Sequence, residues 1–344
     1  MARPGSFLTS PQDASHGGGA APTWAIWAAL ANVYVVWGST YLAIRVVVRT
    51  MPPLLAGGIR FVIAGALLYP FAARRGDRDG DRPTWRHWRS AAIIGGALLL
   101  GGNGLVMWAE RTVPSGIASL IIATVPLWML VVGASVLRER RSWREVAGIA
   151  IGFGGVALLV RPSGGGGLDP AGIAMLFMAA LFWASGSLYA RRASLPSRPL
   201  VGTAMQMLAG GVILLIAGVA SGELGDLHPA EFSGESLIAL GYLVVFGSLV
   251  GFTAYAWLLR VARTSLVATY AYVNPVVAVF LGWAVLHESI TGITLLAGGI
   301  ILAAVALIVS AKPAEQPESL APAGEPAAAP PFDDGDLEPG TATA

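Results

Sequence analysis

The sequence predicts an all-α polytopic membrane protein whose ten transmembrane helices form a 5+5 inverted repeat, with both termini cytoplasmic. Three observations predict this fold class: long apolar runs, the placement of arginine between them, and a similarity between the two halves. Of the 344 residues, 55% are hydrophobic and 12% are charged, and the mean hydropathy is +0.67. An average soluble domain has about 25% charged residues, so this chain has too little polar surface for a water-soluble fold.

Ten runs are long enough to cross the bilayer as helices. A crossing takes about 20 apolar residues, because each helical residue rises about 1.5 Å. The predicted spans are residues 26–48, 54–73, 91–109, 115–137, 143–160, 170–189, 200–220, 236–259, 264–286 and 290–310. Lipid offers no partner for open backbone groups, and barrel strands would be shorter and alternating, so these runs are predicted to be helices.

The placement of arginine supports this count, because basic residues concentrate in cytoplasmic loops. With the N-terminus inside, most of the 22 basic residues fall in inside segments: Arg3, Arg74, Arg75, Arg78, Arg82, Arg86, Arg89, Arg138, Arg140, Arg141, Arg144, Arg191, Arg192, Arg198, Arg260, Arg263 and Lys312. The outside loops hold Arg49, Arg111 and Arg161. The alternation continues through every loop, so both termini are predicted to be cytoplasmic.

The two halves of the chain resemble each other. Trp37 aligns with Trp183, and the later helices align Pro126 with Pro275 and Glu139 with Glu288. Each half has five helices, so the second copy enters the membrane from the opposite side, which is typical of secondary transporters. We expect a disordered N-terminal segment (1–22), a first repeat (26–161), a Gly-rich linker (162–169), a second repeat (170–310) and a disordered acidic tail (311–344).

Four segments carry a resemblance to a known family. They are WGSTYLAIRVVV from Trp37, MPPLLAGGIRFVIAGALL from Met51, VPSGIASLIIATVPLW from Val113 and YVNPVVAVFLGWAVLHESIT from Tyr272. Together they resemble the drug/metabolite transporter (DMT) superfamily, in particular its ten-helix branch with two EamA domains and the YedA-type drug/metabolite exporters. The resemblance covers residues 26–310. It implies a multi-pass protein of the cytoplasmic (inner) membrane that moves small metabolites, amino acids or drugs, in many members outward.

Candidate substrate-binding residues are the polar and aromatic side chains expected at mid-depth: Trp37, Ser39, Tyr41, Arg60, Asn103, Trp183, Ser185, Gln206, Tyr270 and Asn274. An aromatic box with a few hydrogen-bonding groups suits an amphipathic metabolite. A single Trp or Tyr could instead belong to the interfacial belt. Arg60 could anchor an anion or form an ion pair, or it could snorkel to the outer interface. Gln206 stands where the first copy has Arg60, which is a departure from the repeat.

Candidate coupling or gating residues are two mid-helix prolines and three glutamates at helix ends: Glu110, Pro126, Glu139, Pro275 and Glu288. A proline frees a backbone carbonyl for a substrate or a gate, or it only kinks the helix. Glu110 could bind a coupling proton, or it could pair with Arg111 or Arg60 at the interface. The other two glutamates are expected in structural or gate ion pairs.

The expected partners are a small-molecule substrate, the lipid bilayer and, if transport is coupled, protons. We expect no nucleic acid, metal or cofactor, since the chain has no cysteine and the basic residues follow the membrane topology. The sequence leaves the oligomeric state open between monomer and homodimer.

Two other functions were weighed against a secondary transporter. Its one lysine, Lys312, lies in the tail, so the chain has no phosphate-loop lysine and is not an ATP-driven pump by itself. It could still be the permease subunit of an ATP-driven transporter that has a separate ATPase. An intramembrane enzyme is disfavoured, since no histidine is placed at mid-span to serve a nucleophile or a metal. We therefore expect no enzyme activity.

Overall fold

The computed structural model describes residues 22–74, 82–136, 143–160, 168–262, 264–267 and 269–310. These residues fold into helices with no β-strand among them, so the predicted all-α, multi-pass fold is confirmed. The N-terminal segment up to residue 21, most of the Gly-rich linker and the acidic tail lie outside the described residues. Our expectation that these segments are disordered stays a prediction.

The first repeat consists of seven α-helices and one π-helical segment. In chain order they are α1 (Thr23–Val47), α2 (Pro53–Arg74), α3 (Trp85–Gly95), the π-helix η1 (Gly96–Gly104), α4 (Leu105–Ala109), α5 (Ser115–Ile122), α6 (Val125–Val136) and α7 (Trp143–Leu159). The segments α3, η1 and α4 follow one another directly and make one membrane span, residues 85–109.

The second repeat follows the same order. It consists of α8 (Pro170–Ala190), α9 (Pro199–Ala220), a short 3₁₀ turn η2 (Pro229–Glu231), α10 (Gly234–Tyr242), the π-helix η3 (Leu243–Val250), α11 (Gly251–Val261), α12 (Thr264–Val267), α13 (Tyr270–Leu286) and α14 (Gly292–Ser310). Across the described residues, 7 helical segments are long and apolar enough to cross a membrane, and shorter apolar helices fall at 145–159, 270–286 and 292–308. These segments correspond one to one with the ten predicted spans.

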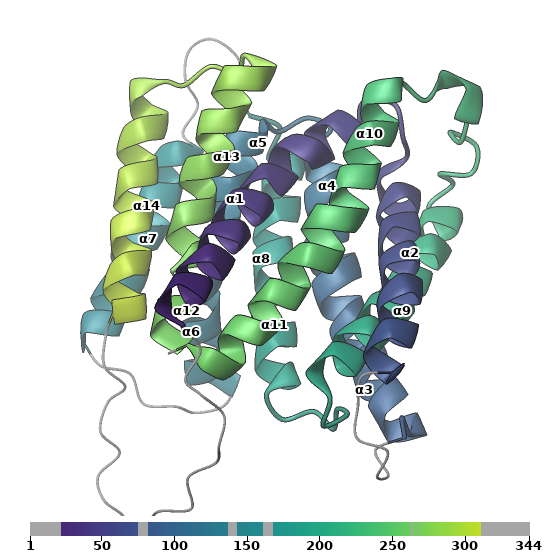
Figure 1. Cartoon of the computed structure of the whole chain (residues 1–344). Coiled ribbons are helices and arrows are strands. Elements are labelled where there is room, and N and C mark those ends of the chain that lie inside the picture. The colour runs from purple at the N-terminus through teal and green to yellow at the C-terminus, as the bar shows by residue number, and fades with distance from the viewer. Residues whose placement is uncertain are drawn as a thin grey trace, which may run out of the picture. The chain divides into compact units, whose positions relative to one another are not determined.

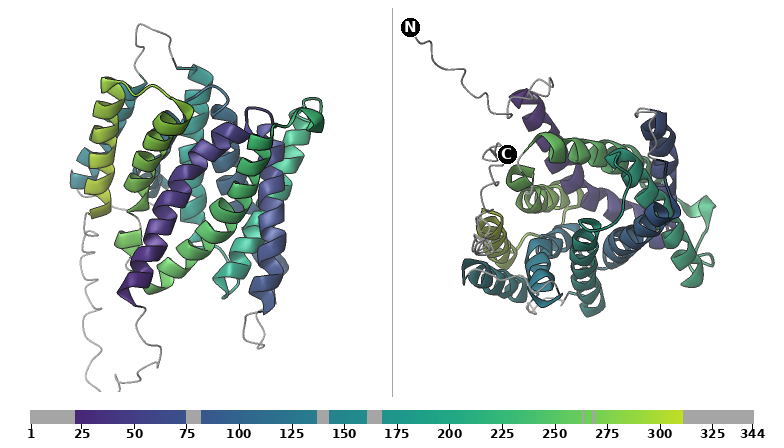
Figure 2. Two further views of the ribbon diagram at one scale, coloured as in Figure 1. Left: turned by 45° about the horizontal axis from the view of Figure 1, so that its top comes forward. Right: turned by 90° about the horizontal axis from the view of Figure 1, so that it is seen from below.

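The two repeats interleave within the helical bundle (Figure 1). The largest helix contacts all join one repeat to the other: α2 with α9, α7 with α14, α1 with α13, and α3 with α9. Figure 2 shows the helices side by side when the bundle is seen along their axes. Gly95 and Gly210 let α3 and α9 touch through their backbones, because a Cβ at Gly95 would lie 2.8 Å from the Gly210 amide nitrogen.

The fourth span differs from the prediction of one helix over residues 115–137. The helix ends at Ile122 and resumes at Val125, directly before Pro126. Proline lacks an amide donor, so the chain breaks where a continuous helix would have lost a hydrogen bond. In the second repeat Pro275 lies inside α13, and the interruption falls earlier, between α12 and α13.

Candidate functional site

A central cavity of about 360 Å³ lies between the two repeats. Its wall takes residues from both repeats, among them Trp37 of α1, Asn103 of η1, Pro126 of α6, Trp183 of α8 and Pro275 of α13. The volume is within the range of about 300–1,000 Å³ that is usual for small-molecule sites. The wall also reaches Arg191 and Ile308, at the C-terminal ends of α8 and α14, which are predicted to face the cytoplasm, and Arg191 is exposed.

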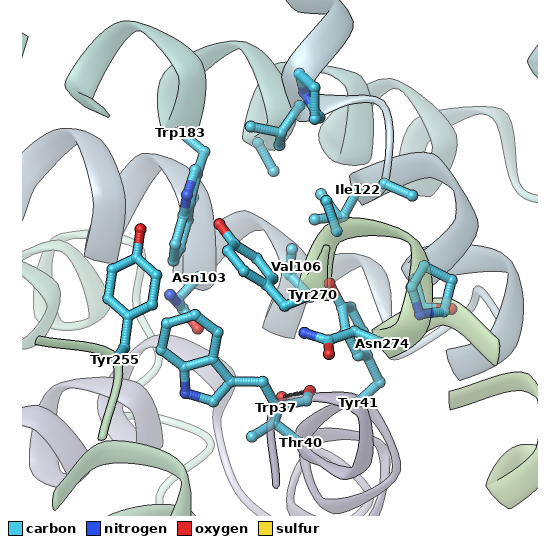
Figure 3. A pocket seen from close by; sticks show the side chains of 18 of the residues that line it. Trp37, Thr40, Tyr41, Asn103, Val106, Ile122, Trp183, Tyr255, Tyr270 and Asn274 are labelled. Atoms are coloured by element: carbon cyan, nitrogen blue, oxygen red, sulfur yellow. Dashed lines mark hydrogen bonds between the residues drawn. The ribbon is translucent and has the colours of Figure 1, made fainter. Parts of the chain in front are cut away.

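Aromatic rings from four helices surround the cavity. Trp37 lies against Tyr255 and Tyr270, with ring centroids 5.1 and 5.3 Å apart, and Phe252 contacts Trp37 at 5.3 Å. Figure 3 shows Trp37, Trp183, Tyr255 and Tyr270 grouped around one space, with the Asn103 amide among them. These rings offer flat apolar faces, so they suit a ligand with an aromatic or apolar body.

The polar groups of the wall are few. Asn103 lies among the rings (Figure 3). Thr40 and the buried Ser119 also contribute to the wall, and the Thr40 hydroxyl donates to the Trp37 carbonyl of its own helix at 2.6 Å. Asn274 is 8% exposed, and its amide, oriented to suit its neighbours, donates to the carbonyls of Tyr34 and Tyr270 at 3.2 Å each. Asn274 therefore ties α13 to α1 in addition to lining the cavity.

Arg60 brings a buried charge to the wall. Its side chain is 3% exposed, so it does not snorkel to the interface. Its Nε donates to the Ser248 hydroxyl at 3.0 Å, whereas its Nη1 has no hydrogen-bond partner among the described residues. No Asp or Glu is among the described residues that line the cavity.

The two π-helical segments stand at corresponding places in the two repeats, and both contribute to the wall. η1 supplies Gly102 and Asn103, and η3 supplies Gly247. A π-helix widens the turn and often marks a functional site. The sequence of η1 is rich in glycine, whereas η3 holds a single glycine, Gly247, so the two segments share no clear sequence signal.

The structure brings some of the predicted substrate residues together and leaves others outside the cavity. Seven line the cavity: Trp37, Tyr41, Arg60, Asn103, Trp183, Tyr270 and Asn274. Three do not. The Ser39 hydroxyl bonds to the Tyr242 hydroxyl at 2.6 Å, Ser185 is half-buried outside the wall, and Gln206 borders a separate small pocket.

Of the gating candidates, the two prolines line the cavity, whereas Glu288 is not among its lining residues. Glu288 reaches from the end of α13 to the N-terminus of α5, where its carboxylate accepts from the Ser115 amide (2.8 Å), the Ser115 hydroxyl (3.0 Å) and the Gly116 amide (3.2 Å). The turn that places it depends on His287 in the left-handed conformation, at φ 56°. Thus Glu288 bonds a helix N-terminus of the other repeat in place of the expected ion pair. Glu139 lies outside the described residues.

Glu110 is fully buried at the outer end of α4. Neither carboxylate oxygen has a hydrogen-bond partner among the described residues. The charged groups that act on it are Glu288 and Arg45, and Arg45 donates to the main-chain carbonyl of Glu110. The expected pairing with Arg111 or Arg60 is not among these contacts. An enclosed carboxylate of this kind is costly to keep charged, which suits a proton-binding role.

Two further carboxylates cap helices at the outer surface. Glu223 is 5% exposed and accepts from the Leu54 and Leu55 amides at 3.1 and 2.9 Å, so it joins the second repeat to the start of α2. Asp169 caps α8 through the Ala171 amide at 3.1 Å and also accepts from the Thr112 hydroxyl at 2.7 Å. The Thr112 hydroxyl, followed by the Ala171 amide, holds the pKa of Asp169 below its usual value.

Sequence reasoning missed several residues of the site. Thr40, Ser119, Phe252 and Tyr255 line the cavity, but they stand in apolar runs with no distinguishing pattern. Glu223 is likewise not distinguished by any sequence pattern. Such a carboxylate caps a helix that belongs to the other repeat. The sequence alone does not show which helix start lies next to it in space.

Comparison with known proteins gives the chain's relatives. A family model described as the EamA-like transporter family matches twice, at residues 22–161 and 170–310. The chain is 40% identical over 292 residues to the "Uncharacterized inner membrane transporter YedA" of Escherichia coli K12, covering 83% of this chain and 91% of that protein.

Two further matches are more distant. The "Probable amino-acid metabolite efflux pump" of Salmonella typhimurium is 27% identical over 291 residues, covering 79% of this chain and 90% of that protein. A solved crystal structure shares the fold at a TM-score of 0.57 with 21% identity, covering 83% of this chain and 96% of that one.

Proposed function

This chain belongs to the EamA-like transporter family, and from this premise we propose that it exports small metabolites, amino acids or drugs by alternating access. The transport is secondary active or facilitated. The protein is a multi-pass protein of the cytoplasmic membrane. In this proposal it moves a small molecule from one side of that membrane to the other.

The observation that carries the proposal is the asymmetry of the central cavity. Its wall reaches Arg191 and Ile308 at the cytoplasmic helix ends. Towards the outside, the cavity ends at Ile44 on α1, which belongs to a cluster of buried apolar side chains with Val47, Val48 and Val113. This arrangement is that of a carrier whose site faces the cytoplasm.

Contacts between the two repeats close the outer side. Glu288 binds the N-terminus of α5, and Glu223 binds the N-terminus of α2. The buried Ser236 donates to the Val46 carbonyl at 2.8 Å, which ties α10 to α1. Because each contact joins one repeat to the other, a rocking of the repeats would break them together and open the cavity outward.

Glu110 is the group that we assign to proton coupling. It lies fully buried beside this outer seal, with Arg45 and Glu288 as its charged neighbours. When the seal opens, water would reach the carboxylate and a proton could enter or leave. The state of the seal and the protonation of Glu110 would therefore be linked.

The direction of transport is taken as outward. The Salmonella relative is named as an efflux pump, and the cavity of this chain faces the side from which an exporter loads. A cavity that is open to the cytoplasm is the state in which an exporter takes up its substrate. In a cell that keeps an inward proton gradient, this gradient could drive the export.

Uptake into everted membrane vesicles tests the proposal. The vesicles contain this protein and no ATP, and a panel of labelled amino acids, organic acids and cationic drugs is presented with and without an acidic lumen. Uptake without ATP is expected, and it excludes a permease that needs a separate ATPase. Uptake that rises with the acidic lumen in wild type and not in Glu110→Gln would support the coupling site; equal pH dependence in both would remove Glu110 from that role.

A further inference from the structure

The side chain of Arg60 is a buried cation with no acidic partner among the residues that the structure describes. It is 3% exposed, its Nε donates to Ser248, itself fully buried on η3, and its guanidinium carbon lies 4.6 Å from the centroid of the Phe61 ring. Its Nη1 makes no hydrogen bond with any described residue. A guanidinium has five N–H donors, and the two on Nη1 are without a partner among the described residues.

The charged residues of the cavity wall are cationic in the described part of the chain. Among the residues that form it, Arg60 and Arg191 are the charged ones, and both carry positive charge. Glu110 and Glu288, the acids nearest the outer seal, are not part of the wall. A buried charge without a counter-ion is costly in a low-dielectric interior. A bound anion would remove that cost, and a bound cation would add to it.

The guanidinium lies beside Gly247 of η3. A Cβ at Gly247 would lie 3.1 Å from Nη2 of Arg60 and 3.1 Å from the Thr40 methyl, so a side chain would be crowded there and the glycine lets η3 pack closely against the cation. Arg60, Gly247 and Thr40 together form this part of the cavity wall. Arginine binds carboxylates through two parallel N–H donors, which suits a ligand carboxylate placed there.

The rest of the wall fits an apolar body attached to that anion. Trp37 lies on the same helix as Thr40, and its ring meets Tyr255 and Tyr270. We infer, on the basis of the transport function proposed above, that the substrate is a small organic carboxylate with an aromatic or apolar body, whose carboxylate pairs with Arg60 while the body lies among these rings. Cationic drugs are then poor substrates.

Three probes that share one body but differ in charge test this inference: phenylpropionate, phenylpropionamide and phenylpropylamine. Binding is measured by calorimetry on the purified full chain in nanodiscs. Wild type is expected to bind the carboxylate at least about tenfold more tightly than the amide, and the amine most weakly.

Variants at Arg60 and a matched arginine complete the test. Arg60→Gln places at this position the residue that the second repeat has at Gln206, so the fold is expected to be kept. It should weaken phenylpropionate binding about tenfold or more and leave amide binding within about twofold. Arg60→Lys should restore part of the preference for the anion. The control, Arg192→Gln, removes an exposed arginine outside the wall and should change neither affinity.

Each outcome separates this inference from the transport function. A wild-type protein that binds the amine as tightly as the carboxylate, or an unchanged anion preference in Arg60→Gln, overturns the inference while transport stands. If the protein binds none of the three probes, the inference is also overturned, and transport is then judged by the vesicle assay alone. Retained amide binding in Arg60→Gln shows that a loss of carboxylate binding is not a loss of fold.

Discussion

Replacing Glu288 by glutamine should open the outer side of the protein. The carboxylate accepts three hydrogen bonds at the start of α5, two of them from backbone amides. Glutamine keeps one oxygen acceptor of similar size, but it loses the negative charge and turns an NH₂ group toward donors. Loss of charge-assisted bonds and of the favourable helix N-terminus interaction amounts to about 2 kcal/mol. The ratio of outward-open to inward-open molecules should then rise about 30-fold.

Labelling of a single cysteine measures this shift. The chain has 0 Cys, so Ile44→Cys, at the outer end of the cavity, provides one reactive site. An impermeant maleimide added outside intact cells should label Ile44→Cys at least about tenfold faster when Glu288→Gln is present, and label it more slowly from the cytoplasmic face of everted vesicles. Mere unfolding would not slow the cytoplasmic reaction. The control is Glu235→Gln, an exposed glutamate at the start of α10. An unchanged outside rate, or an equal rise in the control, would refute the role of Glu288.

Three further predictions concern the cavity and one helix cap. Trp37→Ala removes ring contacts at 5.1 to 5.3 Å and should raise KM in vesicle uptake about tenfold. The control Trp24→Ala changes a tryptophan at the membrane surface that is 74% exposed, and it should leave KM unchanged. An equal change of KM in both variants would contradict the aromatic box. Gly102→Ala would place a Cβ 2.6 Å from the Trp183 ring, so it should reduce uptake at normal protein level; wild-type uptake would show that the ring does not shape the site. Asp169→Ala should lower the thermal midpoint. Hydrogen bonds from a threonine hydroxyl and a backbone amide depress the pKa of this carboxyl in the folded protein. The stabilisation by Asp169 is therefore present above the unfolded pKa of about 3.9 and is lost as the pH falls through the folded pKa. A difference in thermal midpoint between wild type and Asp169→Ala that persists in strong acid would contradict this.

The fold could be predicted because two independent signals agree. Apolar length gave the spans, and the alternation of arginine between the loops fixed their orientation. For Pro126 the sequence predicts a freed carbonyl or a kink within one continuous helix, but not a break, since the residues around it are as apolar as the rest of the span. The π-helical segments were not predicted, because they differ from α-helix by one residue per turn and leave no periodic pattern in an all-apolar run.

The site was only partly predictable, for a physical reason that differs between residues. The wall residues Trp37, Asn103, Trp183 and Asn274 could be proposed because polar and aromatic groups at mid-depth need a reason to be there. Tyr255 could not be separated in this way from residues of the interfacial belt. The contacts of the glutamates depend on which helix end of the other repeat lies nearby, and that information is only in the three-dimensional arrangement.

The polar contacts of Arg60 also could not be predicted from the sequence alone. Its depth was ambiguous from the sequence, because an arginine two turns from a helix start can reach either the interface or the core. The structure gives the deciding quantity, a 3% exposed side chain bonded to Ser248. Its lack of an acidic partner could be known only once both repeats were placed around the cavity.

Solute counterflow in proteoliposomes tests the central claim of alternating access most directly. The purified chain is reconstituted as the only protein, without ATP or an ion gradient, and the liposomes are loaded with an excess of unlabelled substrate. A carrier should accumulate trace labelled substrate above its outside concentration for a period before the gradient dissipates, and Trp37→Ala should reduce this accumulation. If the label only equilibrates, as through a channel, or if the solute is covalently changed, the account is contradicted.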